Sequence, residues 1–297
     1  MSPAALSPVI RAALWMSGAL VSFSAMAVAA RQLSAEMSIF QLLAIRSLAG
    51  LVILAAVLQR AGWAQVRTRR IGTHLLRNVA HFGGGYAWFY GVGVISLTEV
   101  FAIEFTVPIW TAILATIFLG ERMTRQRALA VALGFAGILV MLRPGVAAVS
   151  VPALVVLGGA LCFAVAYVVM KRLSASETPL AILFYMNAIQ LPLGLVPALP
   201  QWVWPAADAW PWVGVVAVAG LAAHYCIAKA LRLADASVVV PMDFLRLPLI
   251  AVVGFMFYGE ALSAWVLVGA LIICCATWLN LRSDGRSSTL RAGGTSG

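Results

Sequence analysis

Residues 238–260 read VVVPMDFLRLPLIAVVGFMFYGE, a stretch that is apolar enough to cross a lipid bilayer. It nevertheless carries an acid, Asp243, and a base, Arg246, near its middle, together with Pro241 and Pro248. A charged side chain at the centre of a bilayer costs at least about 2.5 kcal/mol, and a proline inside a helix removes a hydrogen bond. The stretch is therefore expected to contain groups whose pairing or function offsets these costs.

A similar pattern occurs 139 residues earlier in the chain. Residues 101–121 read FAIEFTVPIWTAILATIFLGE, and residues 240–260 read VPMDFLRLPLIAVVGFMFYGE. Glu104 and Glu121 precede Asp243 and Glu260 by the same 139 positions, and F-x-G-E ends both segments. The match predicts an internal repeat; a chance match between two apolar segments is the alternative.

The composition is that of an integral membrane protein. Of 297 residues, 63% are hydrophobic and 10% are charged, and the mean hydropathy is +1.00. Soluble domains carry roughly 25% charged residues. The four cysteines lie inside apolar runs without metal-type spacing, so we expect buried structural thiols.

Apolar segments of about 20 residues can cross the hydrocarbon core as helices. Ten such segments are present: 11–30, 38–58, 76–95, 99–119, 126–143, 152–171, 180–199, 210–231, 236–258 and 263–281. We therefore predict an all-α integral membrane protein with ten transmembrane helices. Five helices in each half make the second half enter from the opposite side, so the two repeats are inverted.

The basic residues predict the orientation. Sixteen of the twenty lie in segments on one side of the predicted spans, two lie on the other side, and Arg46 and Arg246 lie within spans. This asymmetry predicts a plasma (inner) membrane protein with both termini in the cytoplasm. It also accounts for the net charge of +10, so nucleic-acid binding is not expected.

The sequence L-G-E-R-M-T at 119–124 is echoed by Y-G-E-A-L-S at 258–263. With ten helices in two inverted halves, the chain resembles the EamA-type branch of the drug/metabolite transporter superfamily over about residues 10–282. The expected organisation is a first EamA-type repeat at 11–143, a second at 152–281, and a disordered cytoplasmic tail at 282–297.

The resemblance implies a secondary transporter of small metabolites, often amino acids and often exported. Known structures of the family include an exporter of aromatic and other amino acids. We therefore expect export of amino acids, including aromatic and apolar ones, by alternating access. Uptake of a nucleoside-like or vitamin-like metabolite is the alternative, and a channel or an intramembrane enzyme is weighed below both.

Ionisable groups within the spans are candidates for the site because they normally face the bundle interior. Arg46 and Glu104 lie at depths that permit an ion pair, and Asp243 and Arg246 are spaced i, i+3, where they can neutralise each other. One interpretation is that these pairs only hold helices in register. In the other, they line a cavity and bind an ammonium and a carboxylate, or relay a proton.

Further cavity-lining candidates are polar or aromatic. They are His81, Trp88, Trp110, Tyr167, Asn187 and His224. His81 and Trp88 form one helix face with Gly84 or Gly85, and the run Gly83–Gly85 either allows close helix packing or breaks the helix beside a substrate. Core packing and hydrogen bonding between helices remain the alternatives for each of these side chains.

Four residues are candidates for gating or hinge positions. They are Pro108, Pro248, Glu121 and Glu260. The prolines are expected to kink the paired helices, and the glutamates, each beside a glycine, are expected to cap helix ends.

No cofactor, metal or catalytic activity is expected. The sequence holds no Walker A motif, no nucleophile elbow and no zinc or haem cluster. The expected partners are a small-molecule substrate and the lipid bilayer. A ten-helix chain can enclose its own pathway, so a monomer could suffice.

Overall fold

The computed structural model describes residues 6–33, 37–95, 97–143, 150–258 and 263–293. Helices form nearly all of this part of the chain, which contains no strand. In chain order they are α1 (Pro8–Leu33), α2 (Ile39–Ala61), η1 (Trp63–Val66), α3 (Ile71–Val94), α4 (Leu97–Glu104), α5 (Val107–Leu119), α6 (Arg125–Leu142), α7 (Val151–Ser174), α8 (Pro179–Ala198), η2 (Leu199–Gln201), η3 (Ala207–Ala209), α9 (Trp210–Leu233), α10 (Ala236–Val239), η4 (Val240–Leu245), α11 (Arg246–Tyr258) and α12 (Ala264–Gly293).

These helices form the ten spans that the sequence predicts, so the fold class is confirmed. Nine spans of the described chain are long and apolar enough to cross a membrane. The tenth is α3, which matches the predicted span in position and carries His74, Arg77, Asn78 and His81 in its first half. The prediction of a disordered tail from residue 282 stays a prediction; α12 runs to Gly293.

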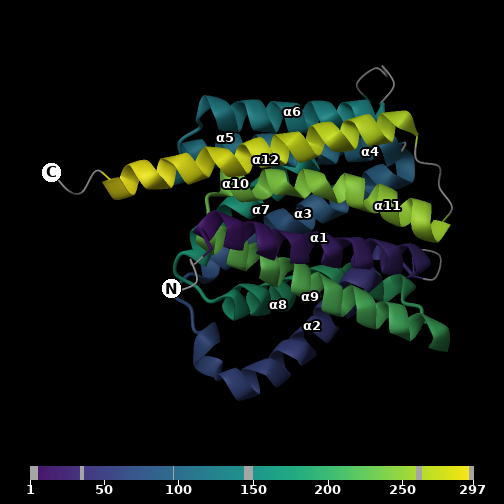
Figure 1. The fold of residues 1–297 in the computed structure, drawn as a ribbon. Helices are drawn as coiled ribbons and strands as arrows, with labels where there is room; N and C mark the ends of the chain where they lie inside the picture. Colours follow the sequence, from purple (N-terminus) through teal and green to yellow (C-terminus); the bar gives the residue numbers. More distant parts are fainter. Residues whose placement is uncertain (1–5, 34–36, 96, 144–149, 259–262, 294–297) are drawn as a thin grey trace.

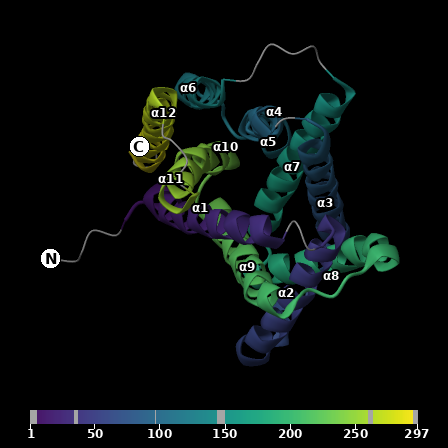
Figure 2. The ribbon, with the colours of Figure 1, turned by 90° about the vertical axis from the view of Figure 1, so that its right-hand side faces the viewer.

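The helix pairs follow the symmetry of an inverted repeat. α1 packs along α9 and α3 packs along α7, and these two pairs exchange when the first half is mapped onto the second. α2 packs along α8 and α6 along α12, and each of these pairs maps onto itself. Figure 2 shows the α2–α8 and α6–α12 pairs at opposite ends of the bundle, with α1 and α9 on one side and α3 and α7 on the other. In Figure 1, α6, α12 and α1 run roughly along the same direction, whereas α2 runs obliquely to them.

Two spans are interrupted at equivalent points. The fourth span stops at Glu104 and restarts as α5 at Val107; the ninth passes through η4 and restarts as α11 at Arg246. Val107 and Arg246 differ by 246 − 107 = 139 positions, the repeat offset. Pro108 and Pro248 lie in the first turns of these second half-helices, where the missing N–H breaks no helical hydrogen bond. Near the expected kinks the α-helical hydrogen-bond pattern is thus interrupted, by a turn in the fourth span and by a 3-10 segment in the ninth.

Side-chain caps fix several helix starts, and one of them recurs at the repeat offset. The hydroxyl of Thr124 accepts a hydrogen bond from the backbone N–H of Arg127 at 3.2 Å, which starts α6. Ser263, which lies 263 − 124 = 139 positions later, accepts from the N–H of Val266 at 3.3 Å and starts α12. Such caps satisfy N–H groups that the first turn leaves unpaired.

Glycines bring neighbouring helices into close contact. A methyl group at Gly84 of α3 would lie 3.0 Å from the carbonyl oxygen of Gly159 of α7, and 2.9 Å from a ring carbon of Phe163. Because α3 is unbroken through Gly83–Gly85, the glycine run does not break the helix, and of its three members Gly84 makes the close packing contact.

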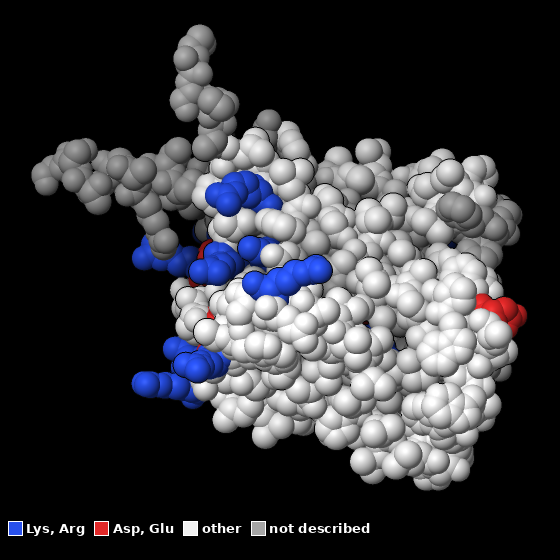
Figure 3. All heavy atoms as spheres, turned by 90° about the horizontal axis from the view of Figure 1, so that it is seen from below, with Lys and Arg blue, Asp and Glu red and all other residues white. Residues whose placement is uncertain are grey.

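The surface between the two ends of the bundle is apolar. Large side chains such as those of Ile117, Phe118, Met256 and Leu271 are about two-thirds exposed, at 66%, 69%, 68% and 66%. Figure 3 shows the described lysines and arginines gathered at one end of a largely uncharged face. This distribution suits a protein whose sides contact lipid and whose ends contact water.

We predict that Gly269→Ala destabilises the fold. Its methyl group would lie 2.6 Å from the carbonyl oxygen of Gly137 and 3.0 Å from the backbone nitrogen of Met141, so α6 and α12 must separate. Overpacking of this kind costs about 1–3 kcal/mol. Thermal unfolding of the purified protein in detergent measures the effect.

Gly158→Ala on α7 is the matched control, because a methyl group there meets no atom within 4 Å. Its unfolding temperature should be unchanged or higher, since alanine favours helix over glycine by up to about 1 kcal/mol. Equal stability of the two variants would contradict the close contact between α6 and α12.

Candidate functional site

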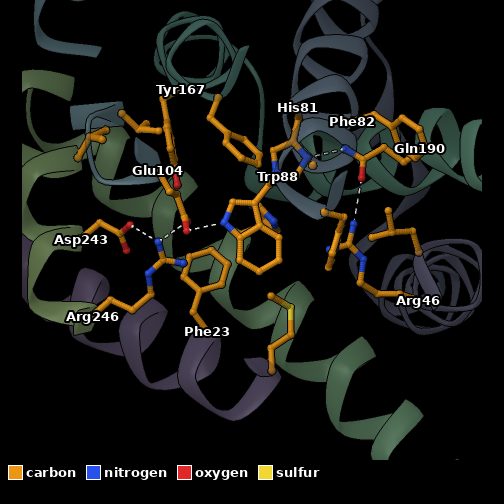
Figure 4. A pocket seen from close by; sticks show the side chains of 18 of the residues that line it. Phe23, Arg46, His81, Phe82, Trp88, Glu104, Tyr167, Gln190, Asp243 and Arg246 are labelled. Atoms are coloured by element: carbon orange, nitrogen blue, oxygen red, sulfur yellow. Dashed lines mark hydrogen bonds and ion pairs between the residues drawn. The ribbon is translucent and has the colours of Figure 1, made fainter. Parts of the chain in front are cut away.

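A cavity of about 200 Å³ lies where the two interrupted spans meet the rest of the bundle. Both halves of the chain contribute to its wall. Its polar and aromatic lining includes Phe23, Arg46, His81, Phe82, Trp88, Phe89, Glu104, Phe105, Phe163, Tyr167, Gln190, His224, Asp243 and Arg246. Figure 4 shows charged groups at two sides of this cavity, with the Trp88 indole between them.

One side of the cavity holds two carboxylates and one guanidinium group; we call Glu104, Asp243 and Arg246 the acid cluster. Nη2 of Arg246 lies 2.7 Å from Oε1 of Glu104 and 3.1 Å from Oδ2 of Asp243. The Trp88 indole N–H donates to the other oxygen of Glu104, Oε2, at 2.7 Å. Glu104 ends α4 of the first half, whereas Asp243 and Arg246 flank the start of α11 in the second. The cluster therefore joins the interrupted fourth span of the first repeat to the interrupted ninth span of the second repeat.

Aromatic rings shield the guanidinium group of Arg246. The rings of Phe23 and Phe105 lie 5.6 and 5.2 Å from its central carbon, in cation–π range. The three charged side chains are only 13–18% exposed. Oδ1 of Asp243 accepts no hydrogen bond from the described part of the chain. One acidic oxygen of the cluster is thus left for another donor.

The opposite side of the cavity is basic; we call Arg46, Gln190 and His81 the arginine side. Nη2 of Arg46 donates to Oε1 of Gln190 at 3.0 Å, and Nε2 of Gln190 lies 3.1 Å from Nδ1 of His81. Gln190 thus connects Arg46 of α2 to His81 of α3. The ring of His224, from α9, lies edge-on to His81 with centroids 5.1 Å apart.

A second arginine lies behind this side, outside the cavity lining. Arg77 is 2% exposed and donates from Nη1 to Oδ1 of Asn78 at 2.6 Å. The amide of Gln190 also reaches Oδ1 of Asn78, at 3.4 Å. The positive charges of Arg77 and Arg46 repel one another. Among the residues that the structure describes, neither arginine forms an ion pair with a carboxylate.

The Asp243–Arg246 contact that the i, i+3 spacing allowed is present, whereas Arg46 and Glu104, whose depths permitted an ion pair, do not form one. Glu104 binds Arg246 and Trp88, whereas Arg46 binds Gln190. Depth along two helices permitted the pair, but the two side chains lie on opposite sides of the cavity (Figure 4).

The structure brings most of the candidate residues together. Nine of them line the cavity: Arg46, His81, Trp88, Glu104, Pro108, Tyr167, His224, Asp243 and Arg246. The face predicted for His81, Gly85 and Trp88 points into it.

Four candidates lie elsewhere. Asn187 packs beside Gly50 of α2 and donates to the carbonyl of Leu183 at 2.8 Å. Trp110 donates to the hydroxyl of Thr106 at 3.1 Å. Pro248 lies in α11 outside the lining, and Glu121 lies at the basic end of the bundle. Glu260 falls outside the described residues.

Gln190, which with Asn187 was expected to hydrogen-bond either a neighbouring helix or the substrate, lines the cavity, whereas the sequence interpretation missed the rings of Phe23 and Phe105. Gln190 carried a usable signal, since a buried amide in a membrane span needs partners. A phenylalanine in an apolar helix carries none, because its side chain is equally suited to lipid, core or cavity.

The comparisons with known proteins agree with this architecture. A family model described as the EamA-like transporter family matches the chain twice, over residues 10–143 and 151–282. The chain belongs to the EamA-like transporter family. It is therefore a multi-pass membrane protein of the drug/metabolite transporter superfamily.

Several curated relatives of this EamA-like transporter match over nearly their whole length. An S-adenosylmethionine uptake transporter of Rickettsia prowazekii (strain Madrid E) is 26% identical, over 95% of this chain and 96% of its own. A riboflavin transporter of Rhizobium johnstonii is 29% identical, over 92% of each chain. A pseudopaline exporter of Pseudomonas aeruginosa is 24% identical, over 86% of this chain and 90% of its own.

A solved crystal structure shares the fold of this EamA-like transporter. It superposes with a TM-score of 0.79 at 16% identity, and the match covers 90% of this chain and 95% of that chain. At this level of identity the likeness concerns the fold alone.

We predict that Gly85→Leu blocks the cavity without disturbing the fold. Gly85 lines the cavity, and a Cβ atom added there meets no atom within 4 Å, so the leucine side chain would start in open space beside the cavity. Flux of the transported substrate should fall about tenfold or more, equivalent to a loss of about 1.4 kcal/mol in binding.

Gly83→Leu is the matched control, because Gly83 is exposed, outside the lining and equally free of neighbours. Transport into proteoliposomes and unfolding temperature are measured for both variants. Unimpaired flux in Gly85→Leu would remove the cavity from the transport path.

Proposed function

We propose that this protein is a secondary transporter that moves a small metabolite across the bacterial inner membrane by alternating access. The observation that carries the proposal is the acid cluster, in which Glu104 of the first half is bound to Arg246 of the second. Inverted repeats that rock against one another open a central site to each side in turn. Charged groups at the contact between the two repeats are then positioned to bind a substrate.

A polar contact at the basic end supports a closed gate there. Glu121, at the end of α5, accepts from the backbone N–H groups of Ala236 and Ser237 at 2.7 and 2.9 Å. It also accepts from the hydroxyl of Ser237 at 2.7 Å. The carboxylate therefore caps α10 of the opposite half, where a negative charge at a helix N-terminus is favourable.

Lys171 forms further hydrogen bonds at the same end of the bundle. Its ammonium donates to the backbone carbonyls of Leu231 and Ala234, both at 2.6 Å, at the C-terminus of α9. A cation is favourable at this end of a helix dipole. Opening of the basic end by movement of one half against the other requires the contacts of Glu121 to separate, whereas those of Lys171 join two helices of the same half.

The distribution of charge supports an orientation with both termini in the cytoplasm. The end that carries the described basic residues is the end where α5, α7 and α9 finish and α6 and α10 begin. Under the positive-inside rule, this end faces the cytoplasm.

For the substrate, we favour uptake of a nucleoside-like or vitamin-like metabolite. The names of the relatives support this class, since they include transporters for S-adenosylmethionine and for riboflavin. The aromatic lining, with Trp88 at its centre, suits a flat ring. Export of amino acids is the second candidate, favoured by the presence of acids and an arginine in one cavity.

We predict that reconstituted protein transports a member of a labelled panel of riboflavin, riboflavin 5′-phosphate, S-adenosylmethionine, adenosine and amino acids. Glu104→Gln and Asp243→Asn should each lower the flux at least about tenfold, because charge-assisted hydrogen bonds contribute about 1.5–3 kcal/mol. Uptake by proteoliposomes with and without a pH gradient measures the flux.

Asp208→Asn is the control, because Asp208 is exposed in η3, away from the cavity. Wild-type flux in a folded protein with both Glu104 and Asp243 neutralised would end a transport role for these acids. Saturable counterflow would distinguish a carrier from a channel.

We predict that Glu121→Ala loosens the basic end. The amides of Ala236 and Ser237 lose their acceptor, so their hydrogen exchange should accelerate about tenfold or more, as loss of hydrogen bonds to a charged group implies. Exchange followed by mass spectrometry on peptides covering α10 measures this change. Arg122→Ala, which changes an exposed neighbour, should leave exchange in α10 unaltered. Equal acceleration in both variants would contradict the role of Glu121 in holding α10.

A further inference from the structure

The two sides of the cavity differ in charge and in how well their charges are paired. The acid cluster has two carboxylates for one guanidinium group, a formal excess of one negative charge. The arginine side has Arg46, with Arg77 behind it, and neither forms an ion pair with a carboxylate in the described chain. The cavity therefore has an acidic side and a basic side, with apolar side chains between them.

Arg46 has unused capacity to bind an anion. Its side chain is 8% exposed and lines the cavity, yet its one side-chain hydrogen bond within the described chain goes to the neutral amide oxygen of Gln190. Its Nε is buried and has no hydrogen-bond partner among the residues that the structure describes. A guanidinium group has five donors in a planar fork that matches a carboxylate or a phosphate. A buried guanidinium group that has no ion-pair partner is stabilised most by an opposite charge.

The network around Arg46 holds the guanidinium group in place. Gln190 accepts from Arg46 with one amide atom and reaches His81 and Asn78 with the other. Arg77 is tied to the same Asn78 oxygen at 2.6 Å. A preorganised donor binds an anion without first losing side-chain freedom.

The two charged sides are far apart along α3. Trp88 holds Glu104 of the acid cluster, and His81 holds Gln190 of the arginine side. Seven residues separate these two contacts, which is about 10 Å along a helix. An α-amino acid carries both of its charges on one carbon, so it can satisfy only one side at a time. A neutral flat molecule leaves Arg46 without an anion.

We propose that the cavity selects an elongated metabolite with an anionic group, a carboxylate or a phosphate, held by Arg46 at one end. At its other end, a cationic or hydrogen-bond-donating group meets the carboxylates of Glu104 and Asp243; Oδ1 of Asp243 is buried and has no hydrogen-bond partner in the described chain. A flat ring lies between them beside Trp88. This inference rests on the proposed transport function and specifies the substrate class of the same cavity.

Binding of matched ligand pairs to the purified protein in nanodiscs tests the proposal. Riboflavin and riboflavin 5′-phosphate differ only in a phosphate; S-adenosylmethionine and its decarboxylated form differ only in a carboxylate. The wild-type protein should bind the anionic member of at least one pair tenfold or more tightly. The pair that shows this preference identifies the anion as phosphate or carboxylate.

Arg46→Gln should abolish that preference, and Arg46→Lys should restore part of it, because lysine keeps the charge but lacks the fork. Arg232→Gln removes an exposed arginine outside the cavity and should leave the preference intact. If Arg46→Gln does not fold, the wild-type pairs and Arg46→Lys still decide the matter. Equal binding within both pairs, no binding of any of the four ligands, or a full preference in Arg46→Gln overturns the proposal.

Failure of this proposal differs from failure of the transport function. Flux of a panel member with no anion preference would refute the substrate class and leave transport standing. A preference that depends on Arg46, without flux in proteoliposomes, would support the binding site and refute transport.

Discussion

The structure depends on one constraint: a charge inside the hydrocarbon must find a partner, and the partner of Arg246 is supplied by the other half of the chain. Its contact with Glu104, at 2.7 Å, links the end of α4 to the start of α11. The two helix interruptions bring their charged residues to this point, and prolines stand where each second half-helix begins. The interrupted helices, the contact between the two halves and the cavity thus meet at the Glu104–Arg246 ion pair. Asp243 is a second carboxylate bound to the same arginine.

The halves are alike in backbone and unlike in side chains. The interruptions recur at an offset of 139 residues, and so do the acids Glu104 and Asp243. Arg246, however, corresponds to Val107, and His224 corresponds to Gly85, which leaves open space in the wall. A symmetric backbone lets the cavity open to each side of the membrane in turn. The asymmetric lining gives the cavity one acidic and one basic side, so a bound molecule has a direction within it.

Most of the frame could be predicted from the sequence, because apolar length and the repeat are properties of long segments. The kinks expected at Pro108 and Pro248 lie close to the interruptions, and the i, i+3 spacing allowed the contact between Asp243 and Arg246 that the structure contains. The partner of Arg46 could not be predicted, because depth along a helix does not fix the direction in which a side chain points. Asn187 and Gln190, three residues apart on α8, illustrate the limit. One packs against α2 and the other lines the cavity, and only the neighbouring helices decide between them.

The polar face of α3 has a consequence for biogenesis. Its buried groups find their partners in α7 and α8: Arg77 contacts the sulfur of Met170, and Asn78 donates to the carbonyl of Tyr185. Those partners lie 93 and 107 residues further along the chain, so the ribosome makes them well after α3 has emerged. Until then, α3 carries an arginine and an amide that lipid cannot solvate. The third span therefore completes its hydrogen bonding only when helices of the second half pack against it.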